Sequence, residues 1–263
     1  MASRPDITKL ILWLSLQSDG SDSHTGEVDF SAVNGPVSHA AAKVGNGADF
    51  DYASSQYYSV ADPHAGQVGA NSFTISGWIK SDGDWQIKPT YNGVWRCGNS
   101  VNSGGVLLRM AREDPQTPPE PAVLAASLFG DDSDPGSEST IHGDQVYPDT
   151  WYFFAAVHNA TANTWKIYGD AVTPGTVAQE ATETYTFTPA DPAGRAGTIG
   201  YAGTVNYLEG IIDEFTIWND ALTLAELQYL CNDGDGISYA AYLADAGSPS
   251  GYNKVDLSLG VRL

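Results

Sequence analysis

One stretch near the end of the chain constrains the fold most. Residues 210–218 read GIIDEFTIW, a run with the apolar content of a buried strand. Side chains alternate along a strand, so the odd-numbered residues 211–217 are predicted to share one face. Asp213 is the acid in that otherwise apolar row, and a buried carboxylate is costly unless it is hydrogen-bonded, paired or bound to a metal. The stretch therefore predicts a buried strand whose acid needs a partner supplied by the fold.

The pattern changes from strand to helix after residue 220. Thr223 and Glu226 stand three residues apart and match a capping box, in which each side chain bonds the backbone N–H of the other residue. Leucines then recur at helical spacing through residue 230. The sequence therefore predicts one short helix directly after the acid-bearing strand.

Most of the remaining chain has the composition of short strands joined by turns. It contains 28 Gly, 14 Pro, 7 Trp and 14 Tyr, and only 17% of its residues are charged. Apolar or alternating runs recur from residue 10 to residue 201, separated by segments rich in Gly, Pro and Asp. We therefore predict an all-β chain of short strands with one short C-terminal helix.

Five segments, in this order, resemble those of the laminin-G-like, concanavalin A-like jelly-roll domains. They are GNGADF at 45–50, FTISGWI at 73–79, WYFFAA at 151–156, TIG at 198–200 and GIIDEFTIWNDAL at 210–222. The resemblance implies a two-sheet antiparallel β-sandwich, the jelly roll, over residues 1–236 and leaves residues 237–263 as a C-terminal tail. Because apolar residues alternate from 255 to 263, the tail would pack either on its own sheet or on a neighbouring subunit's edge. Such a resemblance implies a fold without specifying an activity.

The charge of the chain excludes two classes of partner. With 12 Lys and Arg against 32 Asp and Glu, its net charge is −20, which repels nucleic acid and anionic membranes. A solvated acidic surface explains this excess, and the alternative is that some of the acids coordinate Ca²⁺. Neither a secretion signal nor a membrane-spanning run is visible in the sequence. Cys97 and Cys231 are predicted to be buried free thiols rather than a disulfide.

The sequence lacks the side-chain arrangements that catalysis would need. Glycosidases require carboxylates that face one cleft. The related glucanases carry Glu-x-Asp-x-x-Glu, whereas Glu27 and Asp29 are followed here by Ala32 in place of the third acid. Glu180 and Glu183 are three residues apart, which would point them to opposite faces of a strand. Because no nucleophile elbow, phosphate loop or histidine metal spacing is present either, we predict that the protein is not an enzyme.

A structural calcium ion is the cofactor that the resemblance implies. In the similar jelly rolls, the acid of the last strand binds Ca²⁺ together with backbone carbonyls, and the matching residue here is Asp213. Gly45 or Gly47 would supply a carbonyl, and Asp22 would close the shell. The alternative is that Asp213 accepts hydrogen bonds from backbone N–H groups and holds no ion.

Trp85 and Tyr91 are the candidate glycan-binding residues, because they lie in a turn-rich insertion and the other Trp residues fall in strand patterns. Our first hypothesis for function is a non-catalytic virion surface protein, of the capsid-decoration or tail-fibre type, that also adheres to cell-surface glycans. Its partners would be other virion proteins or itself, and it would reach an extracellular place from the cytoplasm without a signal peptide. The alternative is a free carbohydrate-binding module or lectin, and the third hypothesis is a glycoside hydrolase.

Overall fold

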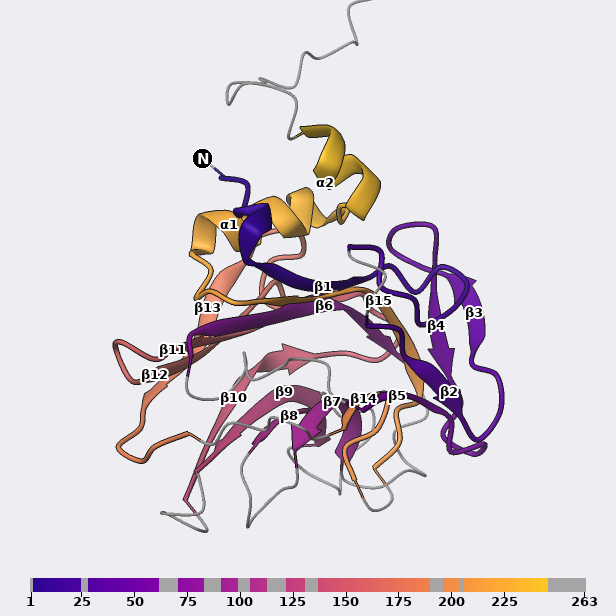
Figure 1. Cartoon of the computed structure of the whole chain (residues 1–263), viewed down its shortest axis with the longest axis horizontal. Coiled ribbons are helices and arrows are strands. Elements are labelled where there is room, and N and C mark those ends of the chain that lie inside the picture. Colours follow the sequence, from indigo (N-terminus) through magenta and orange to yellow (C-terminus); the bar gives the residue numbers. More distant parts are fainter. Residues whose placement is uncertain are drawn as a thin grey trace, which may run out of the picture.

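The computed structural model shows two antiparallel sheets packed face to face, with helices over one outer face (Figure 1). It describes residues 2–24, 28–61, 71–82, 91–98, 105–112, 122–130, 137–189, 196–203 and 206–245. The first sheet has the strand order β13-β12-β11-β6-β15-β4-β3, and β1 also pairs with β15. The second sheet has the order β10-β9-β8-β7-β14-β5-β2. The predicted all-β sandwich with a short helix near its C-terminal end is confirmed.

The elements have the following bounds. The strands of the first sheet are β1 (Leu10–Leu14), β3 (Ser38–Ala41), β4 (Asn46–Phe50), β6 (Phe73–Ser81), β11 (Tyr152–Asn159), β12 (Thr164–Gly169), β13 (Ala178–Thr184) and β15 (Gly210–Trp218). Those of the second sheet are β2 (Ser31–Val33), β5 (Tyr57–Val60), β7 (Tyr91–Gly98), β8 (Gly105–Arg112), β9 (Ala122–Phe129), β10 (Glu138–Val146) and β14 (Gly197–Ile199). The helical segments are η1 (Ile7–Lys9), α1 (Leu224–Cys231), η3 (Asn232–Gly234) and α2 (Tyr239–Asp245).

The main core lies between the two sheets, where alternate side chains of each strand meet. Trp95 of the second sheet and Phe215 of the first sheet are both fully buried there, with ring centroids 6.4 Å apart. Burial of one large apolar side chain contributes about 1.5–3 kcal/mol, so these inward rows account for much of the sandwich's stability.

A second apolar cluster lies on the outer face of the first sheet, beneath residues 224–245, which we call the helical cap. Trp13, Trp78 and Trp218 project from the sheet into this cluster, and Leu227 and Tyr242 cover them from the two helices. The central strands of the sheet are therefore buried on both faces, which explains why β1, β11 and β15 read as almost continuously apolar runs.

Side-chain hydrogen bonds hold both helices of the helical cap in place. The predicted capping box is present, because Thr223 accepts the N–H of Glu226 and the Glu226 carboxylate accepts the N–H of Thr223 at 2.8 Å. Helix α2 lies within the predicted tail, and its Tyr242 donates a hydrogen bond of 2.6 Å to the carbonyl oxygen of Pro5. Residues from 246 onward, including the alternating segment, lie outside the described residues.

Strand β15 departs from simple alternation at a β-bulge. Against β6, Asp213 pairs with Trp78 and Thr216 pairs with Ser76, so two residues of β15 stand opposite one residue of β6. The residue after Asp213, Glu214, has a φ of +47°, in the left-handed region that non-glycine residues seldom adopt. Such a bulge shifts the faces to which the following side chains point.

The bulge overturns the predicted faces of this strand. Ile212 lies in the main core with Phe215 and Ile217, whereas Asp213 pairs with Trp78 on the cap side. The prediction that Asp213 shares a face with Phe215 and Ile217 is therefore wrong, although the acid is buried as expected. The physical reason is the extra residue, which moves the alternation by one position.

Candidate functional site

Asp213 ties the closing strand to the turn between β3 and β4. Its Oδ2 accepts the N–H of Val44 at 2.7 Å, and its Oδ1 accepts the N–H of Glu214 at 2.9 Å. Burial raises the pKa of Asp213 to about 7, although the backbone N–H donors act in the opposite direction. The carboxylate thus has the backbone partners that a buried acid needs.

The other predicted calcium ligands are held in hydrogen bonds or strand pairing of their own. The carbonyl oxygen of Gly45 accepts the N–H of Ala42 at 2.9 Å, and Gly47 belongs to the paired strand β4. Asp22 is buried, and its Oδ1 accepts the N–H of Trp13 at 3.0 Å. In the described part of the chain, no group of three His, Cys, Asp or Glu side chains is placed to hold a metal ion. These hydrogen bonds fit the alternative in which Asp213 is satisfied by backbone N–H groups and holds no ion. The calcium site stays a prediction.

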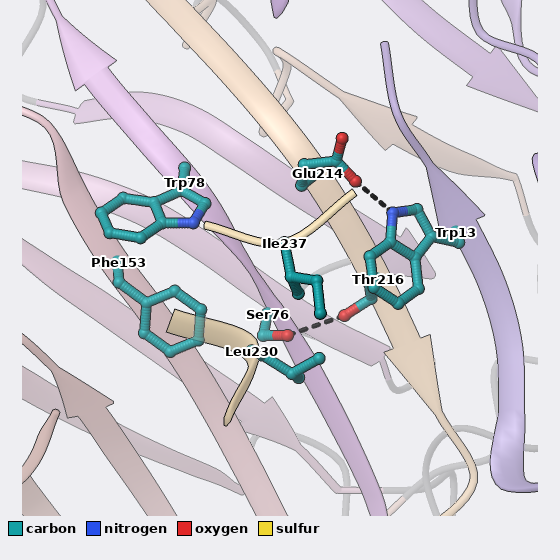
Figure 2. Close-up of a pocket in the computed structure, with 8 residues that line it drawn as sticks. All are labelled: Trp13, Ser76, Trp78, Phe153, Glu214, Thr216, Leu230 and Ile237. Atoms are coloured by element: carbon teal, nitrogen blue, oxygen red, sulfur yellow. Dashed lines mark hydrogen bonds between the residues drawn. The ribbon is translucent and has the colours of Figure 1, made fainter. Parts of the chain in front are cut away.

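Glu214 reaches into a small pocket beneath the helical cap, as Figure 2 shows. Its Oε2 accepts the indole N–H of Trp13, and its Oε1 is buried with no hydrogen-bond partner among the described residues. Burial raises the pKa of Glu214 to about 9, so the carboxyl is protonated at neutral pH. The pocket has a volume of about 10 Å³, close to that of one water molecule, and its lining residues are Trp13, Ser76, Trp78, Phe153, Glu214, Thr216, Leu230 and Ile237.

The two acids of the closing strand therefore have structural roles. Both are buried, and the pocket at Glu214 is far too small for a sugar ring. Because both partners of Asp213 are backbone groups, the acid-bearing motif links β15 to the β3–β4 turn. A site that binds a ligand has to be sought elsewhere on the molecule.

The predicted aromatic site falls largely on residues of which the structure gives no account. Trp85 lies outside the described residues. Tyr91 is the first residue of β7, and only its backbone is described. Both stay predictions.

Four partly exposed tyrosines gather near one edge of the second sheet, and we call them the tyrosine patch: Tyr52, Tyr57, Tyr201 and Tyr207. The ring of Tyr201 stacks on Tyr57 and on Tyr207, with centroids 4.8 Å apart in each pair. Tyr52 meets Tyr207 edge-on at 6.3 Å. The rings therefore form one contiguous, partly exposed aromatic cluster.

Local backbone geometry explains how the patch forms. In β5 the side chain of Tyr58 enters the main core, so the adjacent Tyr57 faces outward. Tyr201 follows β14 and pairs with Tyr207 across an isolated β-bridge. Gly200 has a φ of +82°, and a Cβ there would lie 2.6 Å from the ring of Phe50, so the turn before Tyr201 requires glycine.

The patch offers both flat apolar faces and polar hydroxyl groups. Burial, and then the neighbouring Tyr201 and Tyr207, raise the pKa of Tyr57, so its hydroxyl stays protonated at neutral pH and is able to donate. At the margin, the Glu209 carboxylate accepts the N–H of Tyr52 at 2.8 Å. Aromatic faces beside hydrogen-bonding groups suit ligands that are apolar on one face and hydroxylated at the rim, as sugar rings are.

The sequence alone does not predict the patch, because its members come from separate segments of the chain. The signal that was available is local: residues 57 and 58 are consecutive tyrosines in an alternating strand, so one of the two has to face away from the core. Nothing in the sequence indicates that Tyr201 and Tyr207 lie beside that outward-facing ring.

Comparison with known proteins agrees with this fold. Residues 52–228 match the laminin G-type family model described as the concanavalin A-like lectin/glucanases superfamily. The chain belongs to that superfamily. No curated protein matches it.

Several solved structures of this superfamily fold are similar at low identity. Domain 4 of AbnA, an extracellular GH43 arabinanase from Geobacillus stearothermophilus in complex with arabinotriose, has 18% identity and a TM-score of 0.61, covering 84% of this chain and 97% of that one. The binding domain of Paraclostridial Mosquitocidal Protein 1 has 15% identity and a TM-score of 0.64, covering 87% and 53%. The binding domain of Botulinum Neurotoxin DC in complex with SialylT has 14% identity and a TM-score of 0.61, covering 86% and 52%. This chain spans about half the length of the two toxin structures, and all three likenesses concern the fold alone.

Proposed function

We propose that this protein is a non-catalytic carbohydrate-binding module that holds a sugar ring against the tyrosine patch. The observation that carries this proposal is the stacking of Tyr57, Tyr201 and Tyr207 at the surface, outside both apolar clusters. Large aromatic side chains contribute most to stability when they are fully buried, so a surface cluster of three points to a binding role. Their ring faces would stack on the sugar, and their hydroxyls would bond its hydroxyls.

Two of the similar structures support this proposal, because their names record complexes with arabinotriose and with SialylT. They favour our alternative hypothesis, a carbohydrate-binding module or lectin, over the virion surface protein that was our first. An extracellular location fits the AbnA domain, which belongs to an extracellular enzyme. In the described part of the chain, no helix is long and apolar enough to cross a membrane.

The described acids support a non-catalytic role, although glucanases belong to the same superfamily. Asp213 is fully buried, and Glu214 lines the small pocket beneath the helical cap. Glu183 is exposed and accepts the hydroxyl of Ser139 at 3.0 Å, whereas Glu180 is held in hydrogen bonds between the sheets. A pair of carboxylates facing one open cleft, as glycosidases require, is not formed by these four residues.

The test is a glycan array that includes arabinotriose, other neutral oligosaccharides and sialylated oligosaccharides, followed by titration of the best binder. Tyr201→Ala should weaken binding by at least tenfold, or about 1.4 kcal/mol, because this ring contacts two others in the patch. Leu243→Ala, which removes an exposed apolar side chain from the helical cap, is the matched control and should leave binding unchanged. Absence of binding to every glycan, or full binding by a folded Tyr201→Ala protein, would refute the proposal.

A further inference from the structure

At the edge of the second sheet opposite the tyrosine patch, the edge strand β10 lies against β13, the edge strand of the first sheet, and each of the two carries a β-bulge. The register of β10 against β9 shifts between His142 and Gln145, so Gly143 and Asp144 form the bulge. The register of β13 against β12 shifts around Glu180, which is left as the extra residue. Bulges turn side chains away from the regular alternation, and the Glu180 side chain reaches across to β10.

Glu180 joins backbone segments of the two sheets. Its Oε2 accepts the N–H of Asp144 at 3.0 Å and the hydroxyl of Tyr152 at 2.6 Å. Its Oε1 accepts the N–H of Ala171, just after β12, at 3.4 Å. Burial raises the pKa of Glu180, and these hydrogen bonds act in the opposite direction. The carboxylate therefore fixes the distance between β10 and the segment that follows β12.

Gly143 leaves the space that the Glu180 carboxylate needs to make these hydrogen bonds. A Cβ at Gly143 would lie 2.5 Å from Oε2 of Glu180, so any other residue would displace the carboxylate. A Cβ at Gly169 would lie 2.1 Å from the hydroxyl of Tyr152, which is one of the donors to Glu180. The arrangement thus depends on two glycines, two bulges and a partly buried acid, all at one place.

The two segments that Glu180 joins are the walls of an open hollow of about 420 Å³. We call it the Tyr147 hollow, and its lining residues are Gly143, Asp144, Gln145, Tyr147, Ala171 and Val172. Tyr147 is 56% exposed and Val172 is 75% exposed. The hollow is open to solvent and holds an exposed aromatic ring beside polar groups, a combination that suits one face of a sugar ring.

The exposure of these two side chains is unusual for this molecule. Among the described residues, the large apolar side chains that stand clearly exposed are Tyr147, Val172, Leu224 and Leu243. Two of these four line the same hollow, although Tyr147 follows β10 of the second sheet and Val172 follows β12 of the first sheet. The fold therefore brings two exposed apolar side chains together beside the backbone segments that Glu180 joins.

We propose that the Tyr147 hollow is a second sugar-binding site, for one neutral sugar residue of a glycan. The ring of Tyr147 stacks on the sugar, Val172 covers its apolar edge, and Asp144 bonds its hydroxyls. A neutral sugar is favoured because the Asp144 carboxylate and a net charge of −20 both repel acidic sugars. This inference rests on the proposed carbohydrate-binding function and adds a site to it.

The two sites are too far apart for one short ligand. In the strand order of the second sheet, five interstrand spacings separate β10 from β5, which carries Tyr57. At about 4.8 Å each, these spacings amount to roughly 24 Å. A trisaccharide would therefore occupy one site at a time, whereas a polysaccharide that engages both would bind with avidity.

The test is NMR titration of the full chain with three neutral trisaccharides: arabinotriose, cellotriose and maltotriose. Two separate groups of amide shifts should move with different dissociation constants, one at residues 143–147 and 171–172 and the other at the tyrosine patch. Tyr147→Ala should weaken the first group about tenfold and leave the second unchanged, and Tyr201→Ala should do the reverse. Glu180→Gln, which keeps the Tyr147 ring, should also weaken the first group because the walls of the hollow lose their fixed spacing.

The outcomes separate this inference from the proposed function. Shifts at the tyrosine patch alone would overturn the second site and leave the proposed function standing. Shifts at the Tyr147 hollow alone would support the inference and remove the patch from the proposed function, and no shifts with any sugar would overturn both. If the amides at the hollow move with protein concentration in the absence of sugar, the surface is a contact between copies of the chain, and the second site is refuted.

Discussion

The buried carboxyl of Glu214 should make the free energy of unfolding of this protein fall as pH rises, and one substitution should remove the contribution of this residue. Burial raises its pKa from 4.5 to about 9, so the folded protein keeps a proton that the unfolded chain releases. Below pH 4.5 both states are protonated and the favourable contribution is complete. Between pH 4.5 and 9, each pH unit should lower the free energy of unfolding by about 1.4 kcal/mol.

Glu214→Gln isolates this effect. Glutamine is uncharged at every pH, and its carbonyl oxygen is able to accept the indole N–H of Trp13 in place of Oε2. The free energy of unfolding of the variant minus that of the wild type should therefore grow by about 4 kcal/mol from pH 5.5 to pH 8.5. Asp213 titrates in both proteins, so to first order it drops out of this difference.

The measurement is urea denaturation at several pH values, followed by tryptophan fluorescence. Glu138→Gln is the matched control, because it makes the same chemical change at an exposed residue of β10. A Glu214→Gln difference that depends on pH no more than that of this control would refute the reasoning. It would mean that Glu214 is already ionised in the folded protein and that its burial has little effect on its charge.

Three further predictions concern other contacts of the closing strand and the helical cap. If the predicted calcium ion binds at Asp213, EDTA should lower the Tm and Asp213→Asn should abolish that change, whereas an unaltered wild-type Tm would favour the hydrogen-bonded alternative. Tyr242→Phe should lower the free energy of unfolding by about 1 kcal/mol through loss of the hydrogen bond to Pro5, and Tyr242→Ala by about 3–5 kcal/mol, both measured by urea denaturation. Thr223→Ala should cost about 1 kcal/mol by removing the N-cap of α1, with Thr223→Ser as a control that keeps the hydroxyl.

The fold was predictable from the sequence because its signals are local. Alternating runs and turn residues indicate strands without knowledge of their partners, and the capping box at Thr223 places the start of α1. Burial of Asp213 followed from its apolar neighbours. The face of the strand on which Asp213 lies could not be predicted in the same way. That face depends on the left-handed conformation of Glu214, whose carboxyl accepts a hydrogen bond from Trp13 near the other end of the chain.

The features that sequence reasoning missed depend on tertiary contacts. Helix α2 lies in a segment expected to be a tail, and its Tyr242 packs against Trp13, with ring centroids 5.2 Å apart, and beneath Arg4 at 4.1 Å. The tyrosine patch and the Tyr147 hollow each combine segments that only the sheet order brings together. The bulge at Glu180 leaves no mark in the composition of its strand, so its role at the hollow could not be anticipated.

The central place of β15 in the first sheet has a consequence for biosynthesis. It lies between β6 and β4 and also pairs with β1, and the contact between Trp13 and Glu214 joins positions 201 residues apart. At about 5–20 residues per second, the ribosome needs roughly 10–40 s between making β1 and making the strand that completes its sheet. During that interval β1, β4 and β6 expose the apolar edges that β15 later covers. The nascent chain should therefore depend on chaperones until β15 has been synthesised.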